Sequence, residues 1–453
     1  MRIIVVGCGK IGSTIIESLV EEHHEVLAID KDYAVVNKMI ETYDVMGICG
    51  NGASYDKLIE ADVERADLFV AVTETDELNM LSCFIASKLG ARHTVARVRN
   101  SEYNTESLRY IKRNLSLNMT INPELLAAEA IYNVLRLPTA SAVETFTARQ
   151  FEMIELYVHQ GSALDGVKLM DLKKNPDMQF LICAIKRGEE TFIPNGSSEI
   201  KSGDKIAIIA PHDDTHTLLK NFGLLKKQAR SVIIVGGSTT AQYLARLLSK
   251  NRVSVKIIEK DKERAQFLGE NLPERVAVLC GDGTDPELMK EEGITSVDAV
   301  VAITGKDEEN ILIAYDAQLG GVGKVIVKVN RDGLFDVAEK LGIESIFSPR
   351  KLVADVVVRY ARALESSIGS TMETLYSVMD GEVEALEFEV MPDFTHVGVA
   401  LKDMKLKKNV LIAAILRGND AIIPSGDDVI QSGDKIIVVS SQHRLCELSD
   451  IIR

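Results

Sequence analysis

The hydrophobic positions of the chain follow two patterns that alternate along its length. Short runs such as 3–6 and 67–71 are apolar on both sides and are separated by stretches with helical spacing. That pattern is typical of parallel strands covered by helices on both faces of a sheet. Runs such as 153–158 and 205–209 belong to the other pattern, in which Gly-rich turns separate short strands. These stretches predict a small α+β domain with a β-rich core.

This order of patterns occurs twice, about 230 residues apart. Residues 185–209 align with 415–439 at a constant offset of 230, and 12 of the 25 positions are identical. We therefore predict an α/β fold in which two doubly wound, parallel-sheet Rossmann-like domains are each followed by a small α+β domain. The predicted domains span residues 1–137, 138–225, 230–365 and 366–453.

A helix predicted over residues 123–137 joins the two parts of the first copy. Its apolar residues form two adjacent stripes, and an arc of that width needs two packing partners. The second copy repeats this pattern from Leu352 to Leu364. Two interpretations are open, namely an internal core helix or a helix that also crosses to another subunit.

The stretch 3–30 contains a strand, a glycine turn, a helix and a second strand that ends in a carboxylate. The turn reads Gly7-Cys8-Gly9-Lys10-Ile11-Gly12. Gly7 allows the tight turn, Gly9 removes a Cβ that would keep a pyrophosphate away, and Gly12 lets the helix pack close to the strand. A diphosphate would lie on the helix N-terminus, where unpaired N–H groups and the helix dipole favour an anion.

Asp30 lies 18 residues after Gly12, close to the usual offset of about 20 for the residue that binds the ribose. A carboxylate there accepts hydrogen bonds from both ribose hydroxyls and repels a 2′-phosphate. The sequence therefore favours NAD or an adenine nucleotide over NADP. The alternative is a Rossmann-like domain whose site binds nothing.

Four further residues are candidates for nucleotide contacts. Lys10 and Arg97 lie where each could bind phosphate, the first in the first helical turn and the second at a strand end. Asn51 could meet the adenine edge, and Thr73 the ribose or pyrophosphate. Residues Thr73 to Asp76 also fit a capping box for the next helix, and we favour that interpretation of Thr73.

The second copy of the glycine turn is altered. Its second and third glycine positions are Ser238 and Ala241, and the added side chain crowds the pyrophosphate approach. Glu259 nevertheless keeps a carboxylate at the ribose position, and Lys328 stands where Arg97 stands in the first copy. The second copy could therefore hold a second nucleotide site that binds more weakly or binds a different nucleotide.

Composition limits the classes of function that the chain can have. The net charge of −15 and the pI near 5.2 argue against binding to nucleic acid or an anionic membrane, since either needs a basic face. No apolar run approaches 18 residues and the chain opens into a strand, so we expect a cytoplasmic protein without a transmembrane helix or secretory signal. We expect buried, reduced thiols at all six cysteines: Cys8, Cys49, Cys83, Cys183, Cys280 and Cys446.

The sequence shows no catalytic pattern. The histidines, His443 among them, fall in no arrangement suited to proton transfer, and no nucleophile elbow is present. We therefore expect a nucleotide sensor that is not an enzyme. The alternative is an NAD-dependent oxidoreductase.

Taken together, the motifs resemble the RCK, or KTN, family of modules that regulate potassium conductance, here in tandem over essentially the whole chain. The residues that carry the resemblance are the glycine turn, Asp30, Gly50-Asn51-Gly52, Asp67, Arg97 and Asn122-Pro123-Glu124. The resemblance implies binding of NAD(H) and of ATP or ADP. It also implies a homotetrameric ring, peripheral on the inner face of the cell membrane, under a membrane-embedded potassium-translocating subunit whose flux the nucleotides gate.

The resemblance also assigns site residues. The implied cofactor-binding positions are Gly7, Cys8, Gly9, Lys10, Ile11, Gly12, Asp30, Lys31, Asn51, Thr73, Arg97 and Glu259. Glu124 matches a glutamate that helps to hold a divalent cation in related rings. The second copy departs from the family at Ser238, Ala241 and Arg350, which puts dinucleotide and cation binding there in doubt.

Overall fold

A computed structural model describes residues 1–100, 103, 105–146, 150–172, 179–366, 372–441, 445 and 447–453. Its contacts divide the chain into two compact units. The first unit contains Met1–Ala127 and Ser348–Glu365, and the second contains Ala128–Phe347 and Ser366–Arg453.

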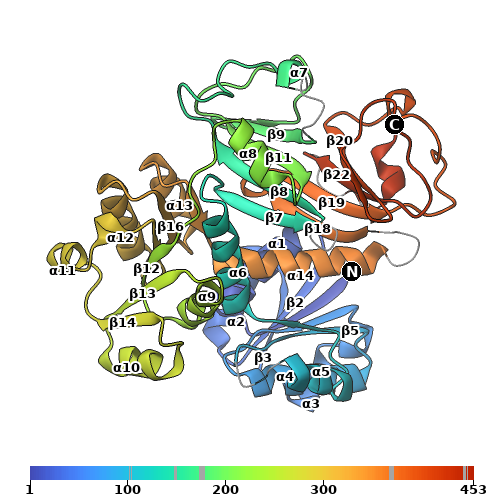
Figure 1. The fold of residues 1–453 in the computed structure, drawn as a ribbon. Helices are drawn as coiled ribbons and strands as arrows, with labels where there is room; N and C mark the ends of the chain where they lie inside the picture. The colour runs from blue at the N-terminus through green and yellow to red at the C-terminus, as the bar shows by residue number, and fades with distance from the viewer. Residues whose placement is uncertain are drawn as a thin grey trace. The chain divides into compact units, whose positions relative to one another are not determined.

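The first unit is built on a six-stranded parallel sheet with strand order β3-β2-β1-β4-β5-β6. This is the doubly wound order of dinucleotide-binding folds. Figure 1 labels strands β2, β3 and β5 of this sheet. The strands are β1 (Arg2–Val6), β2 (Glu25–Asp30), β3 (Met46–Cys49), β4 (Leu68–Ala71), β5 (His93–Arg97) and β6 (Met119–Ile121). The helices are α1 (Lys10–Glu21), α2 (Tyr33–Tyr43), α3 (Tyr55–Glu60), α4 (Asp76–Leu89) and α5 (Thr105–Asn114), followed by the first part of α6 (Pro123–Arg136).

Alternation along β1 explains why its residues are apolar on both sides. Ile3 and Val5 enter one hydrophobic core, and Ile4 and Val6 enter the core on the opposite face of the sheet. Each of these four side chains is at most 1% exposed. The expectation of a sheet covered on both faces is confirmed.

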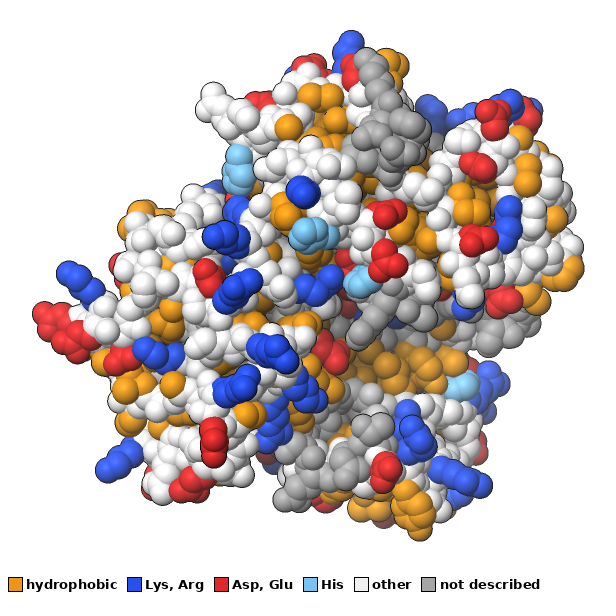
Figure 2. Space-filling view, viewed as in Figure 1, with side chains coloured by type: hydrophobic (Ala, Val, Ile, Leu, Met, Phe, Trp, Pro, Cys, Tyr) orange, Lys and Arg blue, Asp and Glu red, His pale blue; other side chains and the backbone are white. Residues whose placement is uncertain are grey.

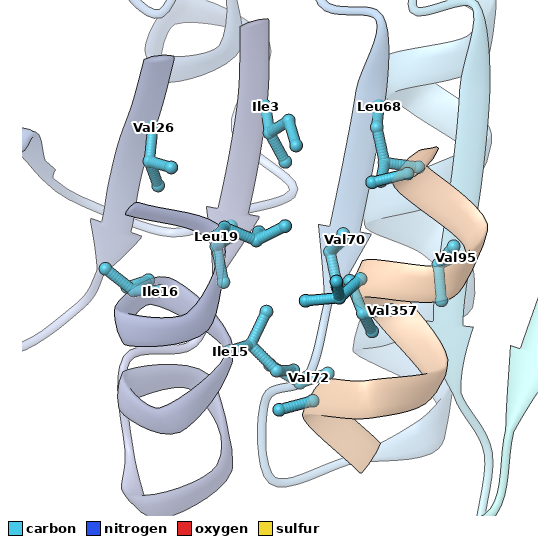
Figure 3. Close-up of a cluster of buried hydrophobic side chains, with 14 of the residues drawn as sticks. Ile3, Ile15, Ile16, Leu19, Val26, Leu68, Val70, Val72, Val95 and Val357 are labelled. Atoms are coloured by element: carbon cyan, nitrogen blue, oxygen red, sulfur yellow. The ribbon is translucent and has the colours of Figure 1, made fainter. Parts of the chain in front are cut away.

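Helix α14 (Pro349–Ser366) comes from the second copy, yet it covers one face of the first sheet. Figure 3 shows its Val357 pointing toward the strand that carries Val70. The buried Arg362 of α14 donates through Nε to Glu22 Oε2 at 2.8 Å, so the helix is also held by an ion pair.

The second unit contains the matching sheet, β14-β13-β12-β15-β16-β17, in which neighbouring strands are parallel. Its strands are β12 (Ser231–Val235), β13 (Ser254–Glu259), β14 (Val276–Cys280), β15 (Ala299–Ala302), β16 (Lys324–Lys328) and β17 (Ser345–Phe347). The helices are α9 (Thr239–Lys250), α10 (Lys262–Asn271), α11 (Pro286–Glu291), α12 (Asp307–Leu319) and α13 (Asp332–Lys340). Residues Ala128, Ile131, Val134 and Leu135 of α6 enter the core of this sheet.

Helices α6 and α14 therefore each supply apolar residues to the sheet of the opposite copy. The wide apolar arcs predicted this need for additional partners, and α6 is an internal core helix, as one of the two interpretations held. The exchange takes place between the two copies within one chain.

Two antiparallel five-stranded sheets complete the second unit, as the β-rich stretches predicted. The first has order β10-β9-β11-β8-β7, made of β7 (Ala142–Phe146), β8 (Phe151–Tyr157), β9 (Leu181–Arg187), β10 (Glu190–Phe192) and β11 (Lys205–Pro211), with helices α7 (Leu169–Leu172) and α8 (Thr215–Asn221). The second has order β18-β19-β22-β20-β21, made of β18 (Met372–Val378), β19 (Val383–Glu389), β20 (Val410–Arg417), β21 (Asp420–Ile422) and β22 (Lys435–Ser440). One hydrophobic core, which includes Met153, Ala207, Ala385 and Val439, joins the two sheets.

Each antiparallel sheet contains the same two-pronged ion pair. Arg187 donates to both carboxylate oxygens of the fully buried Asp204 at 2.7 Å, and Arg417 does the same to Asp434 at 2.9 and 2.8 Å. Asp204 also accepts a bond from Lys201 N at 2.7 Å. The same turn, Ser202-Gly203-Asp204 in one sheet and Ser432-Gly433-Asp434 in the other, therefore anchors an arginine in each.

Two buried lysines lie at other junctions of the second unit. Lys205 Nζ is 2.9 Å from Glu155 Oε2 and 2.9 Å from Asp380 Oδ1, which lies in the other antiparallel sheet domain. Lys324, at the start of β16, donates to the carbonyl of Ala140 at 2.5 Å. Burial lowers the pKa of Lys324 to about 7.

The thiols follow the expectation in part. Among the described residues Cys8, Cys83 and Cys183 are buried, and none of the described cysteines forms a disulfide. Cys280 is exposed because it ends the edge strand β14, and Cys49 is half-buried at the end of the other edge strand, so the expectation of burial was wrong for these two. Cys446 and His443 lie outside the described residues. In the described part of the chain, no helix is both long and apolar enough to span a membrane.

Candidate nucleotide site

The site is built around the turn between β1 and α1. Gly7 has φ +90°, and a Cβ there would lie 2.8 Å from the backbone nitrogen of Thr73. A Cβ on Gly12 would lie 1.9 Å from the carbonyl oxygen of Gly7. Both glycines are therefore required by the close approach of the helix, the turn and the neighbouring strand end.

Gly9 serves a different purpose. It is the N-cap of α1 with φ −65°, so its backbone conformation suits any residue, and a Cβ there would meet no atom within 4 Å. No side chain caps α1. The open space over an uncapped helix N-terminus is where an anionic group can accept N–H bonds.

Asp30 is fixed at the edge of this turn. Its Oδ2 accepts a hydrogen bond from Cys8 N at 2.7 Å, and its Oδ1 accepts one from Asp32 N at 3.0 Å. These bonds hold the carboxylate beside the glycine turn, as required of a residue that binds ribose. The Cys8 thiol itself is buried, and burial followed by the Asp30 charge raises its pKa to about 12.

The ends of β4 and β5 meet at the same edge of the sheet. The backbone N–H and the hydroxyl of Thr73 both donate to Asn79 Oδ1 at 2.7 Å, and Arg97 donates to the carbonyl of Thr73. Helix α4 begins at Asp76 with Thr75 as N-cap, so the capping role favoured for Thr73 was wrong. Thr73 instead bonds to Asn79 across the loop, and this bond satisfies the backbone N–H group at the end of β4.

Arg97 is 8% exposed, and burial followed by the charge of Arg99 lowers its pKa. Asp76 accepts bonds from Arg99 N at 2.8 Å and from Asn100 N at 2.7 Å. Glu124 lies 3.9 Å from Arg99 Nη1, and burial raises its pKa. The described residues contain no group of three or more His, Cys, Asp or Glu able to hold a metal ion.

The remaining predicted residues lie around this core without a bond to it. Lys10 is exposed, and Ile11 packs partly buried against the first core. Lys31 is exposed and pairs with Glu74 at 3.6 Å. Asn51 uses its side-chain oxygen to accept from Ala53 N at 3.0 Å, which shapes the loop after β3.

The second copy keeps the carboxylate but closes its own helix end. Glu259 Oε2 accepts from Gly237 N at 2.6 Å, as Asp30 accepts from Cys8. Ser238 caps α9 by accepting from Ala241 N, and Arg264 donates to the carbonyl of Gly237 at 2.7 Å. The N–H group of Ala241 is therefore bonded to the Ser238 side chain. The matching N–H group of Gly12 has no such partner, because Gly9 has no side chain.

Sequence reasoning missed Asn79 and Asp76, which connect β4, α4 and β5. The second copy repeats both, with Asn310 Oδ1 accepting from Thr304 N and Asp307 accepting from Asn330 N. Both asparagines are fully buried. The signal was an Asp-x-x-Asn spacing present in both copies.

Family models match most of the chain. The TrkA-N domain matches residues 3–123 and 232–349, and the TrkA-C domain matches 153–223 and 385–453. A Trk system potassium uptake protein TrkA homolog from Archaeoglobus fulgidus is 35% identical over 100% of both chains. The TrkA protein of Vibrio alginolyticus is 31% identical over 93% of this chain and 92% of that one. The chain belongs to the TrkA family.

Solved structures share the fold of this TrkA-family chain. The GsuK channel bound to NAD has a TM-score of 0.64 at 15% identity, covering 97% of this chain and 76% of that chain. The GsuK RCK domain has a TM-score of 0.64 at 15% identity, covering 97% of this chain and 92% of that one. The likeness confirms a tandem RCK architecture for the TrkA-family chain.

Proposed function

We propose that this chain is the regulatory subunit of a potassium uptake system and that NAD(H) or an adenine nucleotide bound at the first glycine turn gates potassium flux. The membrane partner is a TrkH- or TrkG-like potassium-translocating subunit. The chain acts at the inner face of the cell membrane as a homotetrameric ring. A divalent cation is not part of this proposal, because Glu124 faces Arg99.

The observation that carries the proposal is the open helix end at Gly9 beside the fixed carboxylate of Asp30. The two features supply the two contacts that a dinucleotide or adenine nucleotide needs, an anion site and a ribose acceptor. Next to these two features, Arg97 donates a hydrogen bond to the carbonyl of Thr73, which joins the ends of β4 and β5. The relatives named for Trk potassium uptake support the regulatory role, and the GsuK channel bound to NAD, which shares the fold, supports the ligand class.

Binding is tested by calorimetric titration of NAD, NADH, ATP and ADP into the full chain. We expect Asp30→Ala to weaken binding roughly 10-fold or more, because a charged acceptor is lost. Glu259→Ala in the second copy is the matched control for the first site. Equal affinity of Asp30→Ala and the native chain would show that the first site is misassigned.

Gating requires a separate experiment. The chain is reconstituted in vesicles with a TrkH-like subunit, and potassium flux is measured with and without each nucleotide. A ligand changes the flux only if it binds the two states of the assembly with different affinity. Nucleotide binding with unchanged flux would refute the regulatory role while leaving the binding site in place.

A further inference from the structure

The second unit contains a basic cavity of ≈ 150 Å³ that is separate from the glycine turn. It lies where α6 ends, beside α8 and the segment that joins the two copies. Its lining includes four side chains that carry or can carry positive charge, Arg136, His212, His216 and Lys226. On the face shown in Figure 2, Lys, Arg and His side chains are visible over the region where Figure 1 places α6 and α8.

A buried carboxylate behind the cavity holds two of these groups. Glu152 is fully buried and accepts a hydrogen bond from Arg136, and His212 Nδ1 lies 2.8 Å from the same Oε1 atom. Glu152 is not among the lining residues. Its charge offsets that of Arg136 and fixes the guanidinium at the cavity wall.

The other two basic residues, one of them a charged lysine, have no carboxylate partner in the described part of the chain. His216 and Lys226 are exposed, and neither forms an ion pair with a carboxylate in the described part of the chain. Lys226 N donates to Thr139 Oγ1 at 3.4 Å, which places the joining segment against the end of α6. The cavity therefore carries a net positive charge, although the whole chain has a net charge of −15.

His212, His216 and Lys226 do not belong to the duplicated fold, whereas Arg136 matches Arg362 of the second copy. At the offset of 230 that relates the copies, Gln442 and Cys446 correspond to His212 and His216, and both positions lie outside the described residues. Lys226 lies in the segment between the copies. Folding of the module therefore does not require these groups, since the second copy is built without the two histidines.

We propose that this cavity binds a small anion carrying a phosphate group, such as inorganic phosphate or a compact phosphate monoester. A guanidinium, an ammonium and imidazoles line the cavity, and each can donate an N–H group to a phosphate oxygen. The cavity is below the roughly 300–1,000 Å³ of sites for drug-sized ligands, which excludes a dinucleotide. A bound anion links α6, α8 and the joining segment through its contacts.

The test uses the full chain with inorganic phosphate as the probe, at constant ionic strength set with chloride. Histidine side chains carry a ¹³C label, and His216→Gln assigns the His216 signal in the NMR spectrum. We expect phosphate, and not chloride, to shift this signal in a saturable way. This local readout separates the cavity from phosphate bound at Gly9.

Two lysine variants give the matched comparison. Lys226→Gln should raise the phosphate dissociation constant read from His216 roughly tenfold, because one charged contact is lost. Lys227→Gln removes the same charge one residue along, outside the lining, and should leave the constant within about twofold. Equal effects of the two variants, or an equal response to chloride and phosphate, would overturn the proposal.

Discussion

Replacing Gly9 by serine should separate folding from nucleotide binding. Gly9 has a negative φ, and a Cβ there would meet no protein atom within 4 Å. Serine is a favourable N-cap, and the difference from glycine is about a few tenths of a kcal/mol. We therefore expect the free energy of unfolding to stay within about 0.5 kcal/mol of the native value.

Nucleotide affinity should change much more. The serine hydroxyl would accept the N–H of residue 12, as Ser238 accepts that of Ala241 in the second copy. Loss of one charge-assisted bond to phosphate corresponds to about 1.5–3 kcal/mol, or roughly 10- to 100-fold in affinity. Calorimetric titration of ADP and NAD measures this loss.

Gly12→Ala is the contrasting variant. Its Cβ would lie 1.9 Å from the carbonyl oxygen of Gly7, so α1 must shift, at a cost of about 1–3 kcal/mol in the free energy of unfolding. Urea unfolding followed by circular dichroism compares the two variants. The reasoning fails if Gly9→Ser loses as much stability as Gly12→Ala, or if Gly9→Ser binds ADP as tightly as the native chain.

Three further predictions concern the second unit. Asp204→Ala and Asp434→Ala should each lower the free energy of unfolding, measured in urea, by about 2–3 kcal/mol, because each removes the carboxylate that pairs with an arginine through two hydrogen bonds. Unequal losses would show that the two repeated ion pairs are not equivalent. Burial opposes ionisation of Asp380, but its two lysine partners lower its pKa overall, so Asp380→Asn should destabilise the chain at pH 7 and the difference should narrow as the pH falls below about 3.9. The pKa of Lys324 is about 7 in the folded chain, whereas the unfolded lysine stays protonated up to about pH 10. The free energy of unfolding of the native chain should therefore rise between pH 7 and about 10. A Lys324→Met variant that keeps this rise would show that Lys324 is not its source.

The sequence predicted the architecture because strand burial and repetition are properties of the residues themselves. The runs that are apolar on both sides became the two parallel sheets, and the glycine spacing placed the turn correctly. The exchange of α6 and α14 could not be predicted, because an apolar arc reveals that a helix needs partners and does not identify them.

The polar interior of the site was harder to predict than its backbone. Thr73 and Thr75 are both possible N-caps by spacing, and only the bond from Thr73 to Asn79 decides between them. Asn79 reads as an ordinary helical residue in one copy. Its recurrence as Asn310, with the same bond to the strand end, shows that it is part of the fold shared by the two copies.

The two copies differ chiefly in which group satisfies the N–H groups at the start of the helix. Both fix a carboxylate beside the turn, but α9 is capped by Ser238 and α1 has no side-chain cap. An anion at the second turn must displace that cap, whereas at the first turn it displaces only solvent. We therefore expect a nucleotide to act most strongly at the first copy.

A reversal of this difference provides the last prediction. Ser238→Gly combined with Ala241→Gly removes the cap and the methyl group, and leaves Glu259 and the nearby Arg264 in place. We expect the calorimetric stoichiometry for ADP to rise from one to two per chain, since the second turn then presents free N–H groups beside a ribose acceptor. Ser238→Ala, which removes only the hydroxyl, controls for the loss of the cap. A stoichiometry that stays at one in the double variant would mean that features beyond the turn, such as Arg264 lying against Gly237, keep the second copy closed.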